Sequence, residues 1–237
     1  MKSAMESDGG RGRLEVITGP MFAGKSEELM RRVRRATIAG LTVMVVNHTL
    51  DARRGAGTVS SHAGGALPAT SVSSAAAVRD LVNGPSGSAA GPVRPLDLLA
   101  IDEAQFFGAD LVPVVVELAE RGVTVVVSGL CLTFDGQPFE PLPELMAGAE
   151  QVTKLLAVCA VCGADAAFHR RVAGRGTAGS PSAEDRVLGT DTAAPGPETT
   201  VPVAGEGAGA GVGNSLETTA EHVGGAGQYQ ARCRRHR

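Results

Sequence analysis

An eight-residue segment near the N-terminus most constrains what this chain can fold into. Residues 19–26 read GPMFAGKS and match the pattern GxxxxGK[ST] of phosphate-binding loops. An apolar run, 14–18 (LEVIT), precedes the segment, and apolar residues at helical spacing over 26–39 follow it. Backbone N–H groups of such a loop and of the helix N-terminus surround a phosphate. The pattern therefore predicts a strand, a nucleotide-binding loop and a helix.

Each residue type in this segment has an expected role. Lys25 is one of only three lysines in 237 residues, and it is expected to reach the β- and γ-phosphates. The Ser26 hydroxyl is a predicted Mg²⁺ ligand. The predicted ATP-binding residues of the loop are Gly19, Pro20, Met21, Phe22, Ala23, Gly24, Lys25 and Ser26.

Further strands and helices alternate along the first 150 residues. Apolar runs at 42–46, 96–101 and 123–128 lack polar alternation, as do parallel strands covered on both faces. A helical pattern covers 111–121. The fold class predicted is α/β, with a mainly parallel sheet and helices on both faces, as in P-loop nucleotide-binding domains. We expect this domain to span 13–155, after a flexible N-terminus at 1–12.

Two adjacent carboxylates end the apolar run LLAI. Asp102 and Glu103 follow that run directly, at the strand end where open α/β sheets bind ligands. Asp102 is a predicted Mg²⁺ ligand, and Glu103 is free to act as a base. Beside a phosphate loop, this pair predicts nucleotide-dependent phosphoryl transfer or hydrolysis, but the acceptor stays open.

Composition excludes several other classes of protein. The net charge is −3 with 20% charged residues, so there is no basic surplus to suggest nucleic acid. No apolar stretch reaches the roughly 18 residues that a membrane span needs, and no signal-type segment begins the chain. A cytoplasmic protein without membrane or nucleic-acid partners is expected. Four cysteines are too few for a disulfide scaffold.

Two close pairs of metal-binding residues lie near the end of the chain. Cys159 and Cys162 form C-x₂-C, and Cys233 and His236 form C-x₂-H. Four such ligands complete a structural zinc site and leave no position for water, so a folding role is expected. Cys131, alone in an apolar setting, is not a predicted ligand.

Residues 173–222 differ from the rest of the chain. They hold seven acidic residues against Arg175 and Arg186, a net charge of −5, and no aromatic residue. Such a segment buries too little apolar surface to offset its ordering entropy. We expect a disordered insertion rather than a domain.

Together these motifs resemble the type II thymidine kinase family, the cellular and bacterial kind. The similar segments are GPMFAGKSEELMRRVRRA, IDEAQFF, LTFDGQPFEPLPELMAGAEQVTKLLAVCAVC and VGGAGQYQARCRRH. The resemblance implies that ATP also contacts Asp102, Glu103, Ala104 and Gln105, and that Glu103 accepts the 5′-hydroxyl proton of deoxythymidine. It assigns substrate binding to Phe106, Phe134, Phe139, Val223, Gly224, Gly225 and Tyr229.

The resemblance also implies a small zinc-bound lasso domain at 156–237, a homotetramer and feedback inhibition by dTTP. The family usually has Gly-Leu-Asp after the fourth strand, where this chain has a thiol at Cys131. Two alternatives therefore stay open beside an ATP-dependent thymidine kinase. One is a P-loop ATPase or nucleotide-dependent switch with a structural zinc lobe, and the other is a relative that binds nucleotide without catalysis.

Overall fold

A six-stranded parallel sheet is the centre of the structure, a computed structural model that describes residues 12–51, 57–60, 65–84, 95–172 and 228–237. Its strand order is β5-β2-β6-β7-β1-β8, and every neighbouring pair is parallel. The strands are β5 (Thr70–Val72), β2 (Val43–His48), β6 (Leu98–Asp102), β7 (Thr124–Gly129), β1 (Arg13–Thr18) and β8 (Gln151–Lys154). The predicted α/β class and parallel sheet are confirmed.

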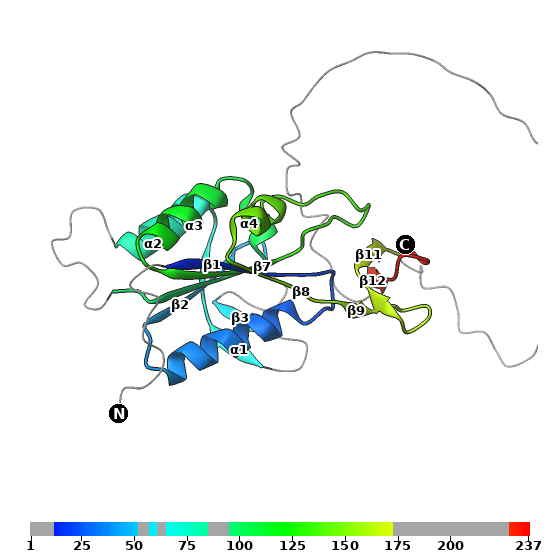
Figure 1. The fold of residues 1–237 in the computed structure, drawn as a ribbon, viewed down its shortest axis with the longest axis horizontal. Helices are drawn as coiled ribbons and strands as arrows, with labels where there is room; N and C mark the ends of the chain where they lie inside the picture. The colour runs from blue at the N-terminus through cyan, green and yellow to red at the C-terminus, as the bar shows by residue number, and fades with distance from the viewer. Residues whose placement is uncertain (1–11, 52–56, 61–64, 85–94, 173–227) are drawn as a thin grey trace, which may run out of the picture. The chain divides into compact units, whose positions relative to one another are not determined.

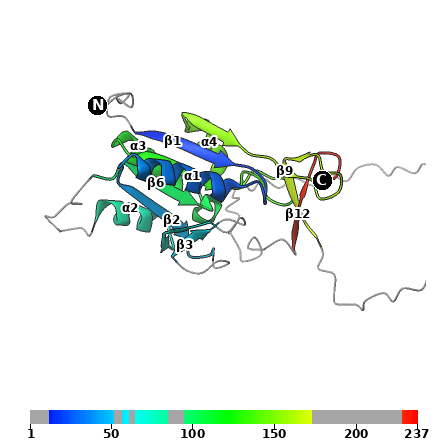
Figure 2. The same cartoon turned by 90° about the horizontal axis from the view of Figure 1, so that it is seen from below.

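Helices cover both faces of this sheet (Figure 1). Helix α1 (Lys25–Ile38) lies on one face, in front of β6 when seen from below (Figure 2). The helices on the other face are α2 (Ala75–Asn83), α3 (Leu111–Glu120) and α4 (Leu142–Gly148). Ala104–Phe107 form a short 3-10 helix, η2, directly after β6.

The alternation of side chains along each strand explains why the central strands are apolar throughout. In β6, Leu99 and Ile101 join the core under α2, α3 and α4, whereas Leu98 and Ala100 join the core under α1. In β7, Val126 likewise packs on the α1 side. Successive side chains of a strand point to opposite faces, so a sheet covered on both faces needs apolar residues at every position.

Four short strands form the two pairs of a smaller lobe, and a third pair flanks the main sheet. The lobe contains β9 (Ala157–Val158) paired with β10 (Asp165–Ala166), and β11 (Phe168–Arg171) paired with β12 (Tyr229–Arg232), both antiparallel. The flanking pair is β3 (Thr58–Ser60) with β4 (Ala66–Pro68).

Parts of the predicted organisation lie outside the described residues. These are the N-terminal residues 1–11 and the whole predicted insertion at 173–222.

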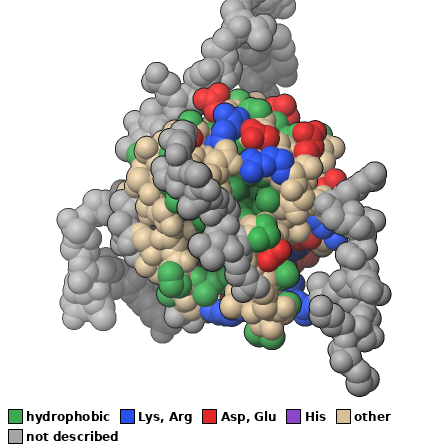
Figure 3. Space-filling view, turned by 90° about the vertical axis from the view of Figure 1, so that its left-hand side faces the viewer, with side chains coloured by type: hydrophobic (Ala, Val, Ile, Leu, Met, Phe, Trp, Pro, Cys, Tyr) green, Lys and Arg blue, Asp and Glu red, His purple; other side chains and the backbone are tan. Residues whose placement is uncertain are grey.

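Within the described residues, acidic and basic side chains lie beside one another on the face in Figure 3. In the same part of the chain, no helix is long and apolar enough to cross a membrane.

Candidate active site and metal centre

Three segments of the site follow three neighbouring strands. The phosphate loop follows β1, η2 follows β6, and the segment 130–139 follows β7. Because all strands of the sheet are parallel, their carboxyl ends lie at the same edge, where α/β sheets bind ligands. The ends of β1 and β7 are also joined directly, since Thr18 Oγ1 donates to the Gly129 carbonyl at 3.2 Å.

The phosphate loop has the backbone that its glycines permit. Gly24 precedes α1 with φ 80°, in the left-handed region that favours glycine. A side chain at Gly19 would place its Cβ 2.4 Å from the Leu155 carbonyl oxygen, so only glycine fits there. Lys25 is 8% exposed, and its Nζ donates to the Pro20 carbonyl at 2.9 Å. The loop thus bends around the ammonium group of its own lysine.

The two carboxylates at the end of β6 differ in environment. Asp102 is buried, and desolvation together with the neighbouring Glu103 charge raises its pKa to about 6, while the hydroxyls of Ser26 and Ser128 act in the opposite direction. Glu103 is half-buried, with φ 51° at the start of η2. A buried carboxyl group beside the Ser26 hydroxyl is a suitable donor set for a hard cation.

A pocket lies beside the phosphate loop. Met21 of that loop is one of its walls, and Tyr229, which is 2% exposed, is another. The ring centroids of Phe134 and Tyr229 are 6.2 Å apart. The pocket is lined by Met21, Leu130, Thr133, Phe134, Phe139, His169 and Tyr229. Its largely aromatic and apolar wall suits a flat ring with few polar edges.

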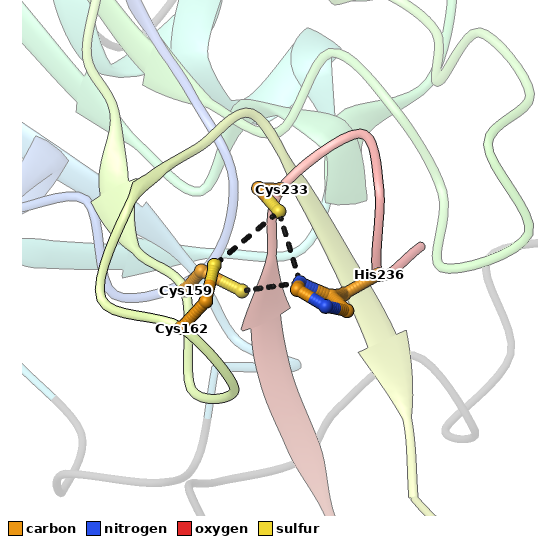
Figure 4. A group of neighbouring side chains, drawn as sticks. All are labelled: Cys159, Cys162, Cys233 and His236. Carbon is orange, nitrogen blue, oxygen red and sulfur yellow. Dashed lines mark hydrogen bonds between the residues drawn. The ribbon is translucent and has the colours of Figure 1, made fainter.

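Cys159, Cys162, Cys233 and His236 come together in the lobe (Figure 4). Their ligand atoms all lie within 4.8 Å of one another. Cys233 Sγ is 3.2 Å from His236 Nδ1, and Cys162 Sγ is 3.7 Å from Cys233 Sγ. Among the described residues, this is the one group of three or more Cys, His, Asp or Glu side chains that could hold a metal ion.

The thiol of Cys159 has a lowered pKa, which favours the form that binds metals. Desolvation acts to raise its pKa, but backbone N–H groups of Cys233, Val161 and Cys162 and the His236 side chain together lower it to about 5. The thiolate is the form that binds metals. Cys131, in contrast, lies in the core under α2, α3 and α4 and is not part of the group.

Comparison with known proteins assigns the family. The model of the family described as thymidine kinase matches residues 12–237. This chain belongs to the thymidine kinase family. The thymidine kinase of Deinococcus radiodurans is 49% identical over 163 residues, which cover 69% of this chain and 77% of that protein. The thymidine kinase of Halobacterium salinarum strain R1 is 47% identical over 165 residues, covering 68% of this chain and 79% of that protein.

Several predicted substrate residues of this thymidine kinase family member meet in the pocket. Phe134, Phe139 and Tyr229 all line it. Phe106 does not line it; that ring is buried, with its centroid 6.1 Å from the His48 ring. The predicted loop residues Val223, Gly224 and Gly225 lie outside the described residues.

Sequence reasoning missed other pocket residues. It gave no role to His169, and it assigned Met21 only to the phosphate loop. Strand alternation relates His169 to Tyr229 once the pairing is known. In the pairing of β11 with β12, His169 lies opposite Ala231, and Arg171 lies opposite Tyr229. His169 and Tyr229 therefore share one face of this two-stranded sheet. The sequence alone does not give this pairing register, so it does not predict that His169 and Tyr229 lie together.

Proposed function

We propose that this thymidine kinase family member transfers the γ-phosphate of ATP to the 5′-hydroxyl of deoxythymidine, giving dTMP. The observation that carries the proposal is that Met21 belongs both to the phosphate loop and to the wall of the aromatic pocket. A nucleoside in that pocket lies next to the phosphate-binding loop. Phosphoryl transfer needs this kind of positioning more than it needs covalent chemistry.

Each part of the site has a role in this reaction. Lys25 and the backbone N–H groups of residues 19–26 bind the phosphates of ATP. Glu103 accepts the proton of the 5′-hydroxyl. Mg²⁺ held by Ser26 and Asp102 would neutralise charge on the phosphate oxygens when bound. Phe134, Phe139 and Tyr229 hold the nucleoside and exclude water, which limits hydrolysis of ATP.

The predicted domain division and the zinc assignment complete the proposal. Residues 13–155 are the kinase domain, and residues 156–237 form the lasso domain that carries the metal. Three thiols and one imidazole are ligands that zinc accepts in closed structural sites. The family resemblance adds a homotetramer, a cytoplasmic location and feedback inhibition by dTTP. Light scattering of the purified protein, with and without dTTP, tests the assembly.

A nucleoside-dependent ADP-release assay tests the reaction. The purified full chain is mixed with ATP, Mg²⁺ and each of the four common deoxynucleosides in turn. We expect ADP release to depend on deoxythymidine and to be slow without any nucleoside. ATP turnover of equal rate with and without nucleosides would instead support the alternative of a P-loop ATPase or switch.

Removing the Tyr229 ring should weaken deoxythymidine binding. The ring is almost fully buried in the pocket wall, and its loss in Tyr229→Ala is expected to raise the KM for deoxythymidine by about 10- to 100-fold. Steady-state kinetics at saturating ATP measure this change. The dissociation constant of ATP should stay the same, because Tyr229 lies outside the phosphate loop.

A second aromatic residue of the lobe provides the matched control. Phe168 precedes His169 on β11 and contacts the guanidinium groups of Arg234 and Arg237, with 5.3 Å and 5.0 Å from ring centroid to Cζ. It does not line the pocket. Phe168→Ala should leave the KM for deoxythymidine within about twofold. Equal KM changes in the two variants would contradict a direct role of Tyr229.

A further inference from the structure

The Gln105 side chain joins the base Glu103 to the wall of the pocket. Gln105 is 1% exposed, on η2. Its Nε2 donates to Glu103 Oε2 at 2.5 Å, and its Oε1 accepts from the Leu130 backbone N–H at 3.0 Å. Leu130 lines the aromatic pocket. One amide group therefore connects the carboxylate with the first residue after β7.

An amide of this length satisfies both ends of the connection. An ionised carboxylate accepts hydrogen bonds and a backbone N–H donates one, so the connecting group needs both a donor and an acceptor. Asparagine has both but is one methylene shorter. Methionine has a similar length and no donor. Glutamine has the length, the donor and the acceptor that the two partners need.

The backbone around Gln105 is adapted to this side chain. A Cβ at Gly129 would lie 2.7 Å from Gln105 Oε1 and 2.9 Å from Leu142 Cδ2. The missing side chain at Gly129 thus leaves the space that the amide occupies. The Glu103 side chain makes no capping hydrogen bond to η2, which it precedes. The amide of Gln105 donates directly to that carboxylate.

We infer that Gln105 is a positioning residue, which fixes the Glu103 carboxylate relative to the nucleoside pocket. This inference rests on the proposed function. It differs from the ATP contact that the resemblance implies for Gln105, because the amide spans Glu103 and Leu130, a residue that lines the pocket. The Gln105 side chain thus contacts both the Glu103 carboxylate, which accepts the 5′-hydroxyl proton, and the backbone of Leu130, on which the nucleoside packs.

Gln105→Met tests this role. We expect kcat for deoxythymidine phosphorylation to fall by about 10- to 100-fold, because a displacement of about 1 Å at a reacting group costs this much. The dissociation constant of ATP should not change. Rates are expressed per deoxythymidine-binding site, counted by calorimetry, so that loss of folded protein does not contribute. Gln151→Met, at an exposed position of β8, is the matched control and should keep the kcat of the unaltered protein.

Gly129→Ala tests the same connection with Gln105 left in place. The new Cβ displaces the amide oxygen, so kcat should again fall while the ATP dissociation constant stays the same. The double variant should be no slower than Gln105→Met alone, since both changes break one connection. If Gln105→Met does not fold, the kcat of Gly129→Ala alone tests the role of Gln105.

Three results would overturn the inference. They are an unchanged kcat in Gln105→Met, an unchanged kcat in Gly129→Ala, and weaker ATP binding with an unchanged kcat. The last result would assign Gln105 to the ATP site. A failure of the proposed function gives a different result: the unaltered protein then releases no ADP in response to deoxythymidine.

Discussion

Replacing Glu103 by glutamine is expected to lower kcat for deoxythymidine phosphorylation by about 10²- to 10⁴-fold, the usual contribution of a general base. The side chain keeps its size, but a neutral amide does not accept the proton of the 5′-hydroxyl. Glu103 directly follows β6, beside β7, which leads to the pocket and separates β6 from β1, the strand that leads to the phosphate loop. Its substitution should therefore change the rate much more than the binding of either substrate.

Steady-state kinetics and calorimetry separate these two effects. The dissociation constants of ATP and deoxythymidine should change little in Glu103→Gln. Glu120→Gln is the matched control, because Glu120 is exposed at the end of α3. That control should have the kcat of the unaltered protein. A Glu103→Gln enzyme with more than a tenth of the original kcat would contradict the role of a general base, which contributes about 10²-fold or more.

Loss of the metal should have the second large effect. Structural zinc contributes about 10–16 kcal/mol to the folding of small zinc domains. In Cys233→Ser one of four ligands changes, so we expect the lobe to lose its metal and its fold. Tyr229 and His169 come from β12 and β11 of that lobe. Deoxythymidine phosphorylation should therefore fall by about 100-fold or more.

The parallel sheet should survive this change. Neither of its two hydrophobic cores contains a residue of the lobe strands β9 to β12. ATP binding to the phosphate loop is expected to persist in Cys233→Ser. Metal analysis should find about one zinc per chain in the unaltered protein and little in the variant.

Cys131→Ala is the matched control for the metal. It removes a buried thiol from the core under α2, α3 and α4, and it should keep the zinc content unchanged. The assignment would be wrong if the unaltered protein contained no metal, or if Cys233→Ser kept both its zinc and its KM for deoxythymidine.

The central strands were predictable because burial on both faces leaves a clear pattern. The predicted runs at 14–18, 42–46, 96–101 and 123–128 each overlap an observed strand and differ from it by at most two residues at either end. The edge strands β5 and β8 were not predicted. Their residues, TSV and QVTK, carry no long apolar run. Such strands form because β2 and β1 offer unpaired backbone groups, which is a property of the sheet and not of the segment.

The site divides in the same way. Local spacing alone predicted the phosphate loop, the carboxylates Asp102 and Glu103, and the four candidate metal ligands, because each of these needs particular residue types a few positions apart. Only the tertiary structure decided that Met21, Leu130, His169 and Tyr229 share one pocket, and that Gln105 lies between Glu103 and the Leu130 backbone. These contacts join residues from separate strands and loops, and their geometry follows from the strand order and from core packing, which no single segment of the sequence encodes.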